Sequence, residues 1–294
     1  MPPPMPFPVV TPLRTAGRAP RVLTFDVEEW FHVCGDEYFS DPRRWDAFAS
    51  RIEITLRRVF ELLETGGHRA TFFFLGWIAA RHPDLVAEAA RRGHEIGVHG
   101  HLHRRADEGS AGQFRDDLLR SCEEVERAGG GRARVHRAAE WSVRAPADPA
   151  LAVLVAEGFA CDASMTPVPP LGLASNHAGA QRIAVQAGAI VEVPPLTGRG
   201  FGRTLPMGGG WPFRMFSAAR VGRAEEAFRA AGWPAVFTFH PWEFDAAHPP
   251  MEGLSPHLRL VHFWNLGSAM ERFERWLAGD RCVALADVLP QLAA

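Results

Sequence analysis

The chain has 294 residues, of which 47% are hydrophobic and 22% are charged, which is ordinary for a folded globular protein. A formal net charge of −2 excludes the strongly basic surface that nucleic acid would require. No run reaches the roughly 18 apolar residues of a membrane-spanning helix, so we expect no transmembrane segment.

The first 20 residues contain seven prolines and lack the apolar stretch of a secretory signal. We therefore predict a mobile tail over residues 1–20 and a single domain over 21–294, with a C-terminal extension from about residue 245. The four cysteines form no CxxC pair and are predicted to be reduced thiols, with a disulfide pair as the alternative. The lack of a secretory signal and the predicted reduced thiols both favour a cytoplasmic location. The cysteines are Cys34, Cys122, Cys161 and Cys282.

From residue 21 onward, short apolar runs alternate with segments of helical periodicity. The runs predict strands over residues 21–26, 70–75, 95–98, 189–193 and 235–239. The periodic segments predict helices over 48–63, 83–92, 114–128, 149–157, 218–231 and 267–277. This alternation predicts an α/β fold with a parallel sheet or a barrel, in which chemistry collects at the carboxyl ends of the strands.

Polar side chains follow several of these predicted strands, where a turn residue would be ordinary. They are Asp26, Glu28 and Glu29 after the first strand, His99, His101 and His103 after the third, Arg144 further on, and His240 and Glu243 after the last. Two imidazoles and a carboxylate are a common zinc-binding set. His99 and His103 could share one side of a helical turn, or all three histidines could share one face of a strand. A polar loop with incidental histidines is the alternative.

These motifs, taken in order, resemble those of the polysaccharide deacetylases, the NodB-homology or carbohydrate esterase family 4 group. The match is to a branch with FDVE(D/E)W near its start and HPWE later, which is associated with bacterial exopolysaccharide production. Four of the family's five motifs are present across residues 21–245, and the fourth motif is not placed. The resemblance implies a distorted (β/α) barrel with its site at the carboxyl ends of the strands.

The resemblance implies that Asp26, in Thr24-Phe-Asp26, is the catalytic base. Val27 stands where the family has a second, metal-binding aspartate. Glu28 shares a face with Asp26 on an extended chain and is predicted to replace that ligand, with Glu29 as the alternative.

The resemblance also implies metal binding by His99 and His103, which match the family's HxxxH motif. His101 is then a spacer at the rim of the site, and His94, before the strand, is structural.

The family's third motif holds an arginine that pairs with the base, and Ser142-Val-Arg144-Ala-Pro146 resembles it. Such a pair would keep the carboxylate ionised and aimed, although Arg144 could also be a surface arginine. Phe237-Thr-Phe-His240 resembles the fifth motif, which implies that His240 is the general acid. Either Glu243 or Asp162 could hold its imidazole.

Aromatic residues near these motifs are candidates for sugar binding. The glycine-rich stretch 207–214 is predicted to line an acceptor groove, and two further tryptophans could shape the sugar pocket. Packing in the core is the alternative for all of them. The predicted substrate-binding residues are Trp30, Trp211, Arg214 and Trp242.

The resemblance therefore implies a metal-dependent hydrolase that removes N-acetyl groups from N-acetylhexosamine units and releases acetate. The substrate would be an oligosaccharide, a polysaccharide or a lipid-linked glycan. A lipid-linked glycan would be hydrolysed near the inner membrane face. One divalent ion is implied, with zinc first and manganese, cobalt or nickel as alternatives. Two other functions stay open: hydrolysis of a small amide or cyclic ureide on the same barrel, and glycan binding without catalysis.

Overall fold

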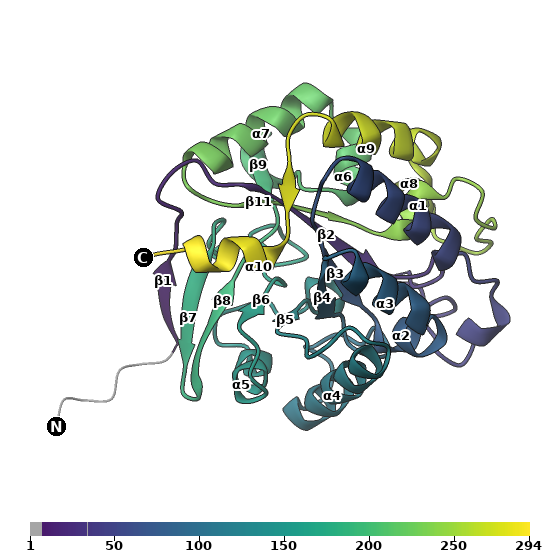
Figure 1. Cartoon of the computed structure of the whole chain (residues 1–294), viewed down its shortest axis with the longest axis horizontal. Coiled ribbons are helices and arrows are strands. Elements are labelled where there is room, and N and C mark those ends of the chain that lie inside the picture. The colour runs from purple at the N-terminus through teal and green to yellow at the C-terminus, as the bar shows by residue number, and fades with distance from the viewer. Residues whose placement is uncertain (1–7, 34) are drawn as a thin grey trace.

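The computed structural model describes residues 8–33 and 35–294, and a 10-stranded sheet runs through its centre (Figure 1). The order of strands is β1-β7-β8-β6-β5-β4-β3-β2-β11, and β12 also pairs with β2. The strands are β1 Val9–Pro12, β2 Arg21–Val27, β3 Thr71–Phe74, β4 Glu95–Val98, β5 Val135–His136, β6 Cys161–Asp162, β7 Gln181–Val185, β8 Gly188–Glu192, β11 Ala235–Phe239 and β12 Cys282–Val283. β9 Thr197–Gly200 and β10 Arg203–Pro206 form a separate hairpin.

The strands from β8 to β11 in this order are parallel, so their carboxyl ends meet at one edge of the sheet. The chain after β8 also reaches β11, because the Leu196 amide donates to the Val236 carbonyl at 2.9 Å. Further along, the Thr238 amide donates to the Gly208 carbonyl at 2.8 Å. These contacts curve the sheet into a distorted barrel, as predicted.

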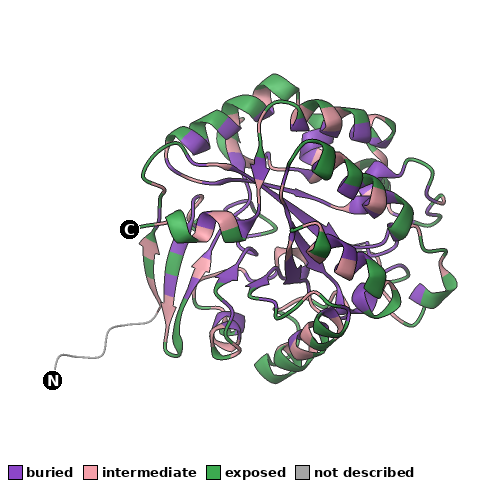
Figure 2. Cartoon of the chain, viewed as in Figure 1, coloured by how far each residue is buried: buried purple, intermediate pink, exposed green. Residues whose placement is uncertain are grey.

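Helices lie around the outside of the curved sheet (Figure 1). Their outer faces are exposed, whereas the strands are mostly buried (Figure 2). In α1 the buried face contains Ile52, Leu56, Val59, Phe60 and Leu63, as the helical periodicity predicted. The helices are α1 Ile52–Thr65, α2 Gly76–Arg81, α3 Pro83–Arg91, α4 Ala111–Arg127, α5 Pro149–Ala156, α6 Gly210–Met215, α7 Ala218–Ala230, α8 Pro256–Phe263, α9 Ala269–Leu277 and α10 Leu285–Val288.

Aromatic packing fixes the two strands that carry the predicted base and acid. Phe25 of β2 stacks on Phe72 of β3, with ring centroids 4.8 Å apart. Phe239 of β11 packs on Phe273 of α9 at 5.0 Å. All four rings are buried, and truncating such a ring to alanine typically costs about 3–5 kcal/mol of stability. The residues that follow these rings, Asp26 and His240, are therefore held by the core.

The prediction of a mobile tail is wrong for the described part of residues 1–20. β1 pairs antiparallel with β7, with Val10 opposite Ile183, and Arg14 bridges to Ala293. Proline misled the prediction, because Pro12 lies at the end of an edge strand, where a missing amide donor is tolerated. Residues 1–7 lie outside the described residues.

Two other predictions concern the whole chain. Within the described ranges, we find no helix that combines the length and apolar character needed to cross a membrane. Cys122, Cys161 and Cys282 are free thiols, while Cys34 lies outside the described residues.

Candidate active site

A cavity of about 310 Å³ opens at the carboxyl ends of the parallel strands. It brings together five of the residues that the motifs predicted, namely Asp26, Glu28, His99, His103 and His240. The pairing of parallel strands explains this gathering, since β2, β4 and β11 end at the same edge.

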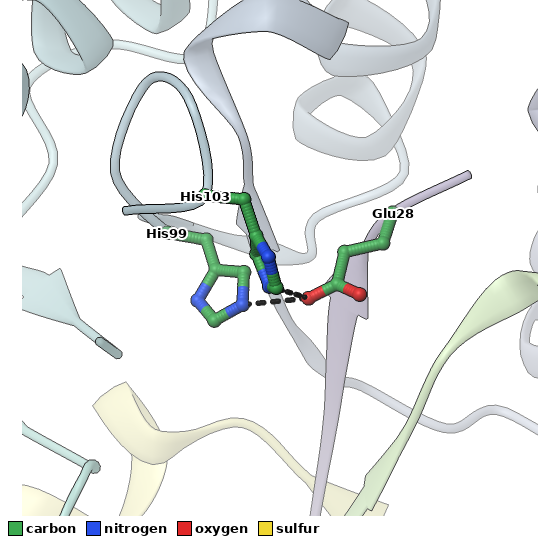
Figure 3. A group of neighbouring side chains, drawn as sticks. All are labelled: Glu28, His99 and His103. Carbon is green, nitrogen blue, oxygen red and sulfur yellow. Dashed lines mark hydrogen bonds and ion pairs between the residues drawn. The ribbon is translucent and has the colours of Figure 1, made fainter. Parts of the chain in front are cut away.

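Glu28, His99 and His103 converge on one point (Figure 3). The Glu28 Oε1 atom lies 2.8 Å from His99 Nε2 and 3.0 Å from His103 Nε2. One donor atom from each residue lies within 4.8 Å of the other two. The two imidazoles and the carboxylate thus form a set that could hold one metal ion.

The hydrogen bond made by the other nitrogen of His99 supports this assignment. His99 Nδ1 lies 2.7 Å from the Arg137 carbonyl oxygen, which can only accept, so this nitrogen carries the proton. The other ring nitrogen, Nε2, points at Glu28 Oε1 at 2.8 Å, which is the direction a metal ligand of this cluster requires. A histidine whose second nitrogen donates to a carbonyl is typical of metal ligands.

The charges in this cluster lead to the same conclusion. Burial acts to raise the pKa of Glu28, yet the positive charge of His103, and after it that of His240, lowers it well below its usual value. Burial acts to lower the pKa of His103, but the Glu28 carboxylate raises it. A proton on His103 here supplies the positive charge that a bound metal ion would otherwise supply.

The HxxxH segment forms a loop, neither a helical turn nor a continued strand. Gly100 and His103 have φ values of 75° and 52°, and the latter is uncommon for a residue with a side chain. Asp117 of α4 holds the loop by accepting from the amides of His101 at 2.6 Å and Leu102 at 3.3 Å. Backbone strain held by such contacts is a frequent feature of functional sites.

Arg137, which the motif comparison missed, pairs with the predicted base. Its Nη1 donates to Asp26 Oδ1 at 2.7 Å and to Thr24 Oγ1 at 2.8 Å, and its Nε donates to the Ala163 carbonyl at 2.9 Å. Both members of the ion pair are buried. The sequence did hold one signal for Arg137, which is its position directly after a short buried strand. The carboxyl end of that strand, β5, faces the site.

The prediction that Arg144 pairs with the base is wrong. Its Nε lies 2.9 Å from Asp107 Oδ2, its Nη1 donates to the Pro170 carbonyl, and 36% of its side chain is exposed. The loop after β5 has already left the edge of the sheet at Arg144, so this side chain ties surface loops together.

His240 lies on the opposite side of the site from the histidine loop and is held by Glu243. Its Nδ1 lies 3.0 Å from Glu243 Oε1, and Glu243 Oε2 accepts from Arg214 Nε at 3.0 Å. Burial acts to lower the pKa of His240, but the Glu28 and Glu243 carboxylates raise it to about 9. The Nε2 atom faces Asp26 Oδ2 at 3.9 Å.

Glu243 therefore settles which carboxylate holds the imidazole. The alternative, Asp162, pairs with His136 Nδ1 at 2.7 Å, away from His240. Arg214 borders the cavity, but its buried guanidinium also donates to the carbonyls of Val261 and His262. Contrary to the substrate-binding prediction, Arg214 positions Glu243 and offers few donors to a ligand.

Two of the three predicted tryptophans line the cavity, namely Trp211 and Trp242. Trp30 belongs to the core instead, because it is 4% exposed and its indole nitrogen donates to the Ala49 carbonyl at 3.0 Å. The ring of Trp30 stacks on His248 at 5.7 Å. The prediction that Trp30 binds sugar is therefore wrong. Its ring packs against neighbouring side chains, and Trp30 is not among the residues that line the cavity.

Glu29, the alternative ligand, points away from the cluster. Its Oε1 accepts from the amides of Arg51 at 2.9 Å and Ile52 at 3.0 Å, at the beginning of α1. It therefore satisfies backbone donors that would otherwise lack partners. His101 is buried beside Gly76 of α2, so its expected place at the rim is also wrong.

Comparison with known proteins adds two family matches. Residues 45–151 match the model described as Polysaccharide deacetylase. That segment belongs to the polysaccharide deacetylase family. Residues 163–289 match a domain of unknown function, DUF3473. The resemblance inferred from the motifs is confirmed for the family, while the particular branch stays a prediction.

The two matched segments meet in the cavity. His99, His103 and Arg137 come from the first segment, and His240 and Glu243 come from the second. The candidate site is therefore complete only when both segments are folded together.

Solved structures share the fold. A candidate polysaccharide deacetylase from Mycobacterium smegmatis is 20% identical with a TM-score of 0.66, over 96% of this chain and 94% of that chain. The peptidoglycan N-acetylglucosamine deacetylase Bc1960 is 16% identical with a TM-score of 0.50, over 94% and 90%. A family 4 carbohydrate esterase pseudoenzyme from Bacillus anthracis is 12% identical with a TM-score of 0.50, over 94% and 66%. No curated protein matches the chain.

Proposed function

We propose that this protein is a metal-dependent hydrolase that removes N-acetyl groups from amino-sugar units of a glycan and releases acetate. The observation that carries the proposal is the convergence of Asp26, His240 and the cluster of Glu28, His99 and His103 in one cavity. The reaction needs a proton acceptor, a proton donor and a group that stabilises negative charge on the amide oxygen.

Glu28, His99 and His103 would hold the metal ion, for which zinc is the first candidate and manganese, cobalt or nickel are the others. When bound there, the ion would polarise the amide carbonyl and lower the pKa of water. The hydrogen bond from His99 Nδ1 to the Arg137 carbonyl orients one ligand, and the Asp117 contacts orient the loop that carries the other.

Asp26 accepts the proton of the attacking water. Arg137 balances the charge of this carboxylate and fixes its direction through the contact at 2.7 Å. Because Arg137 is buried and also tied to Thr24 and Ala163, the pair keeps one geometry. The new C–O bond forms on the carbonyl carbon of the amide.

His240 donates the proton that the leaving nitrogen requires as the C–N bond breaks. Its raised pKa, about 9, keeps the imidazole protonated at neutral pH in the absence of a bound ion. Glu243 holds Nδ1, so Nε2 is the nitrogen that faces the cavity and Asp26. The products are acetate and a free amino sugar.

The proposal is tested by metal content and acetate release measured on the same preparation. Elemental mass spectrometry should find close to one divalent ion per chain, and fewer after His103→Ala. Acetate release from N-acetylglucosamine oligomers should stop after chelation and return when zinc is added back.

Two outcomes would replace the proposal by the functions left open above. Hydrolysis of a cyclic ureide that chelators do not affect would favour the small-amide hydrolase. Glycan binding with no acetate release under zinc, manganese, cobalt or nickel would favour a binding protein without catalysis.

A further inference from the structure

The cavity has a polar floor and an apolar wall. The floor is the cluster of carboxylates and imidazoles described above, and the wall contains Leu171, Pro195, Pro206, Trp211, Leu258 and Val261. None of these six side chains can accept a hydrogen bond, and only the Trp211 indole can donate one. A sugar ring with several hydroxyl groups would find few partners along this wall.

Two of the polar side chains that line the cavity, Arg214 and Thr238, are already engaged. The Arg214 guanidinium is used by Glu243 and by backbone carbonyls of α8. The Thr238 hydroxyl lies 3.0 Å from the hydroxyl of Thr24. This half of the cavity therefore favours hydrocarbon over hydroxyl groups, since burying unpaired polar groups is costly.

The size of the cavity also exceeds what an acetyl group requires. A volume of about 310 Å³ lies in the range of pockets that enclose most of a small molecule. The cavity lining reaches solvent at Leu171, which is 40% exposed. A chain that packs on the wall could therefore continue out of the protein.

The wall lies on the side of the general acid. Trp242 stacks on His240 with ring centroids 5.5 Å apart, and on His262 of α8 at 4.1 Å with an interplanar angle of 2°. His262 follows Val261 directly, so α8 forms the wall next to His240. Because His240 must face the leaving nitrogen, the sugar half of the substrate lies on this side, and the acyl methyl group lies away from it.

We propose that the substrate is a glycolipid, an N-acetylated amino sugar whose hydrocarbon chain packs against Leu258 and Val261. The inference rests on the proposed function, because it uses His240 as the donor to the leaving nitrogen. It narrows the substrate class from any N-acetylated glycan to one that carries an apolar chain on the sugar.

The first test measures binding, which does not depend on turnover. Octyl and methyl β-glucosides, which carry no N-acetyl group, are titrated into the full chain by calorimetry below the micelle concentration. The octyl compound should bind at least about tenfold more tightly, because each buried methylene adds favourable transfer free energy. Equal affinity for the two glucosides would overturn the inference.

A matched pair of variants on α8 assigns the effect to the wall. Leu258 lines the cavity, whereas Leu260, two residues further along, is 53% exposed and lies outside the lining. Leu258→Gln should reduce the octyl preference toward one, while Leu260→Gln should retain it. Equal loss in both variants, or in neither, would mean that the chain binds elsewhere.

The second test measures acetate release from octyl and methyl glycosides of N-acetylglucosamine. A kcat/KM at least about tenfold higher for the octyl compound supports the inference. If only lengthening the N-acyl group raises kcat/KM, the wall holds the acyl chain and the inference is wrong. No acetate from any glycoside, with octyl binding still dependent on Leu258, would defeat the proposed function while supporting an apolar-chain site.

Discussion

Asp26 and Glu28 leave the end of the same strand, two residues apart, yet their neighbours differ in kind. Asp26 contacts the guanidinium of Arg137 at 2.7 Å, and a guanidinium is a cation without needing a metal ion or a titrating partner. Glu28 contacts the imidazoles of His99 and His103, which are cationic only when they are protonated. The first carboxylate always has a cationic partner, whereas the second has one only when a proton or a metal ion is present.

This difference explains how one strand end can supply both a base and a ligand. Val27, between them, is buried on the opposite face of β2, as the alternation of a strand requires. Other strands of the same sheet then decide the chemistry, because Arg137 follows β5 and the histidine loop follows β4. Substitutions that exchange or remove these partners can test the comparison.

The largest effect is expected from Asp26→Asn. The amide keeps the shape of the side chain but cannot take the proton of water, so kcat should fall between about 100- and 10,000-fold. Metal content should stay close to that of the wild type if the ion is held by Glu28, His99 and His103; loss of the ion would instead favour the second possible ligand group, Asp26, Glu28 and His240. Acetate release and elemental analysis of one preparation measure both quantities. Turnover near the wild-type rate would show that Asp26 is not the base.

Glu28→Gln should instead weaken metal retention, by about a hundredfold in dissociation constant, because a charged ligand becomes neutral. Competition with a chromogenic chelator measures this constant. Glu29→Gln is the matched control, since the Glu29 carboxylate caps α1 and lies outside the described group formed by Glu28, His99 and His103. The control should keep the metal and lose about 1 kcal/mol of stability to unfolding. Loss of metal in the control alone would mean that the wrong carboxylate is assigned.

The elements that sequence patterns predicted well are those whose local signals agree with their tertiary surroundings. β4 was predicted over residues 95–98, and α3 was predicted from a proline in its first turn and a glycine after it. The choice of Glu28 over Glu29 followed from strand alternation, and Glu28 lies beside the two histidines whereas Glu29 accepts from the backbone of α1; its role as a ligand stays a prediction. His99 and His103 were predicted from the resemblance to the HxxxH motif, although their loop conformation was not.

The features that the sequence did not reveal depend on contacts between distant segments. Arg137 and Arg144 both follow β5, and only the position of the sheet edge decides which one reaches Asp26. The helix α8 was not predicted, because a residue distant in sequence contributes to its stability. Arg214 of α6 donates hydrogen bonds to the carbonyls of Val261 and His262 in α8. β1 escaped notice because edge pairing with β7 outweighs its proline content.

Arg137→Lys tests the ion pair between Arg137 and Asp26, and its expected effect on kcat is smaller. Lysine keeps the charge but not the planar fork that reaches Asp26, Thr24 and the Ala163 carbonyl together. We expect kcat to fall about tenfold with little change in KM, because the base is misdirected and the ligand contacts remain. Arg144→Lys, on an exposed side chain paired with Asp107, should leave both constants unchanged. A larger loss in Arg144→Lys would reverse the assignment.

The smallest effect is expected for Glu243→Gln and concerns pH. His240 must be protonated to donate to the leaving nitrogen, so activity falls as the pH rises through its pKa. Burial lowers this pKa, while the Glu28 and Glu243 carboxylates raise it to about 9 in the absence of a metal ion. Removing the negative charge of Glu243 lowers the pKa, so the alkaline limb of the kcat profile should move to lower pH, by about one unit. Metal content should not change, because Glu243 contacts His240 and Arg214 and lies outside the ligand cluster. An alkaline limb that stays in place would show that His240 is not the group whose protonation limits turnover, and that the side of the cavity lined by α8 does not face the leaving nitrogen.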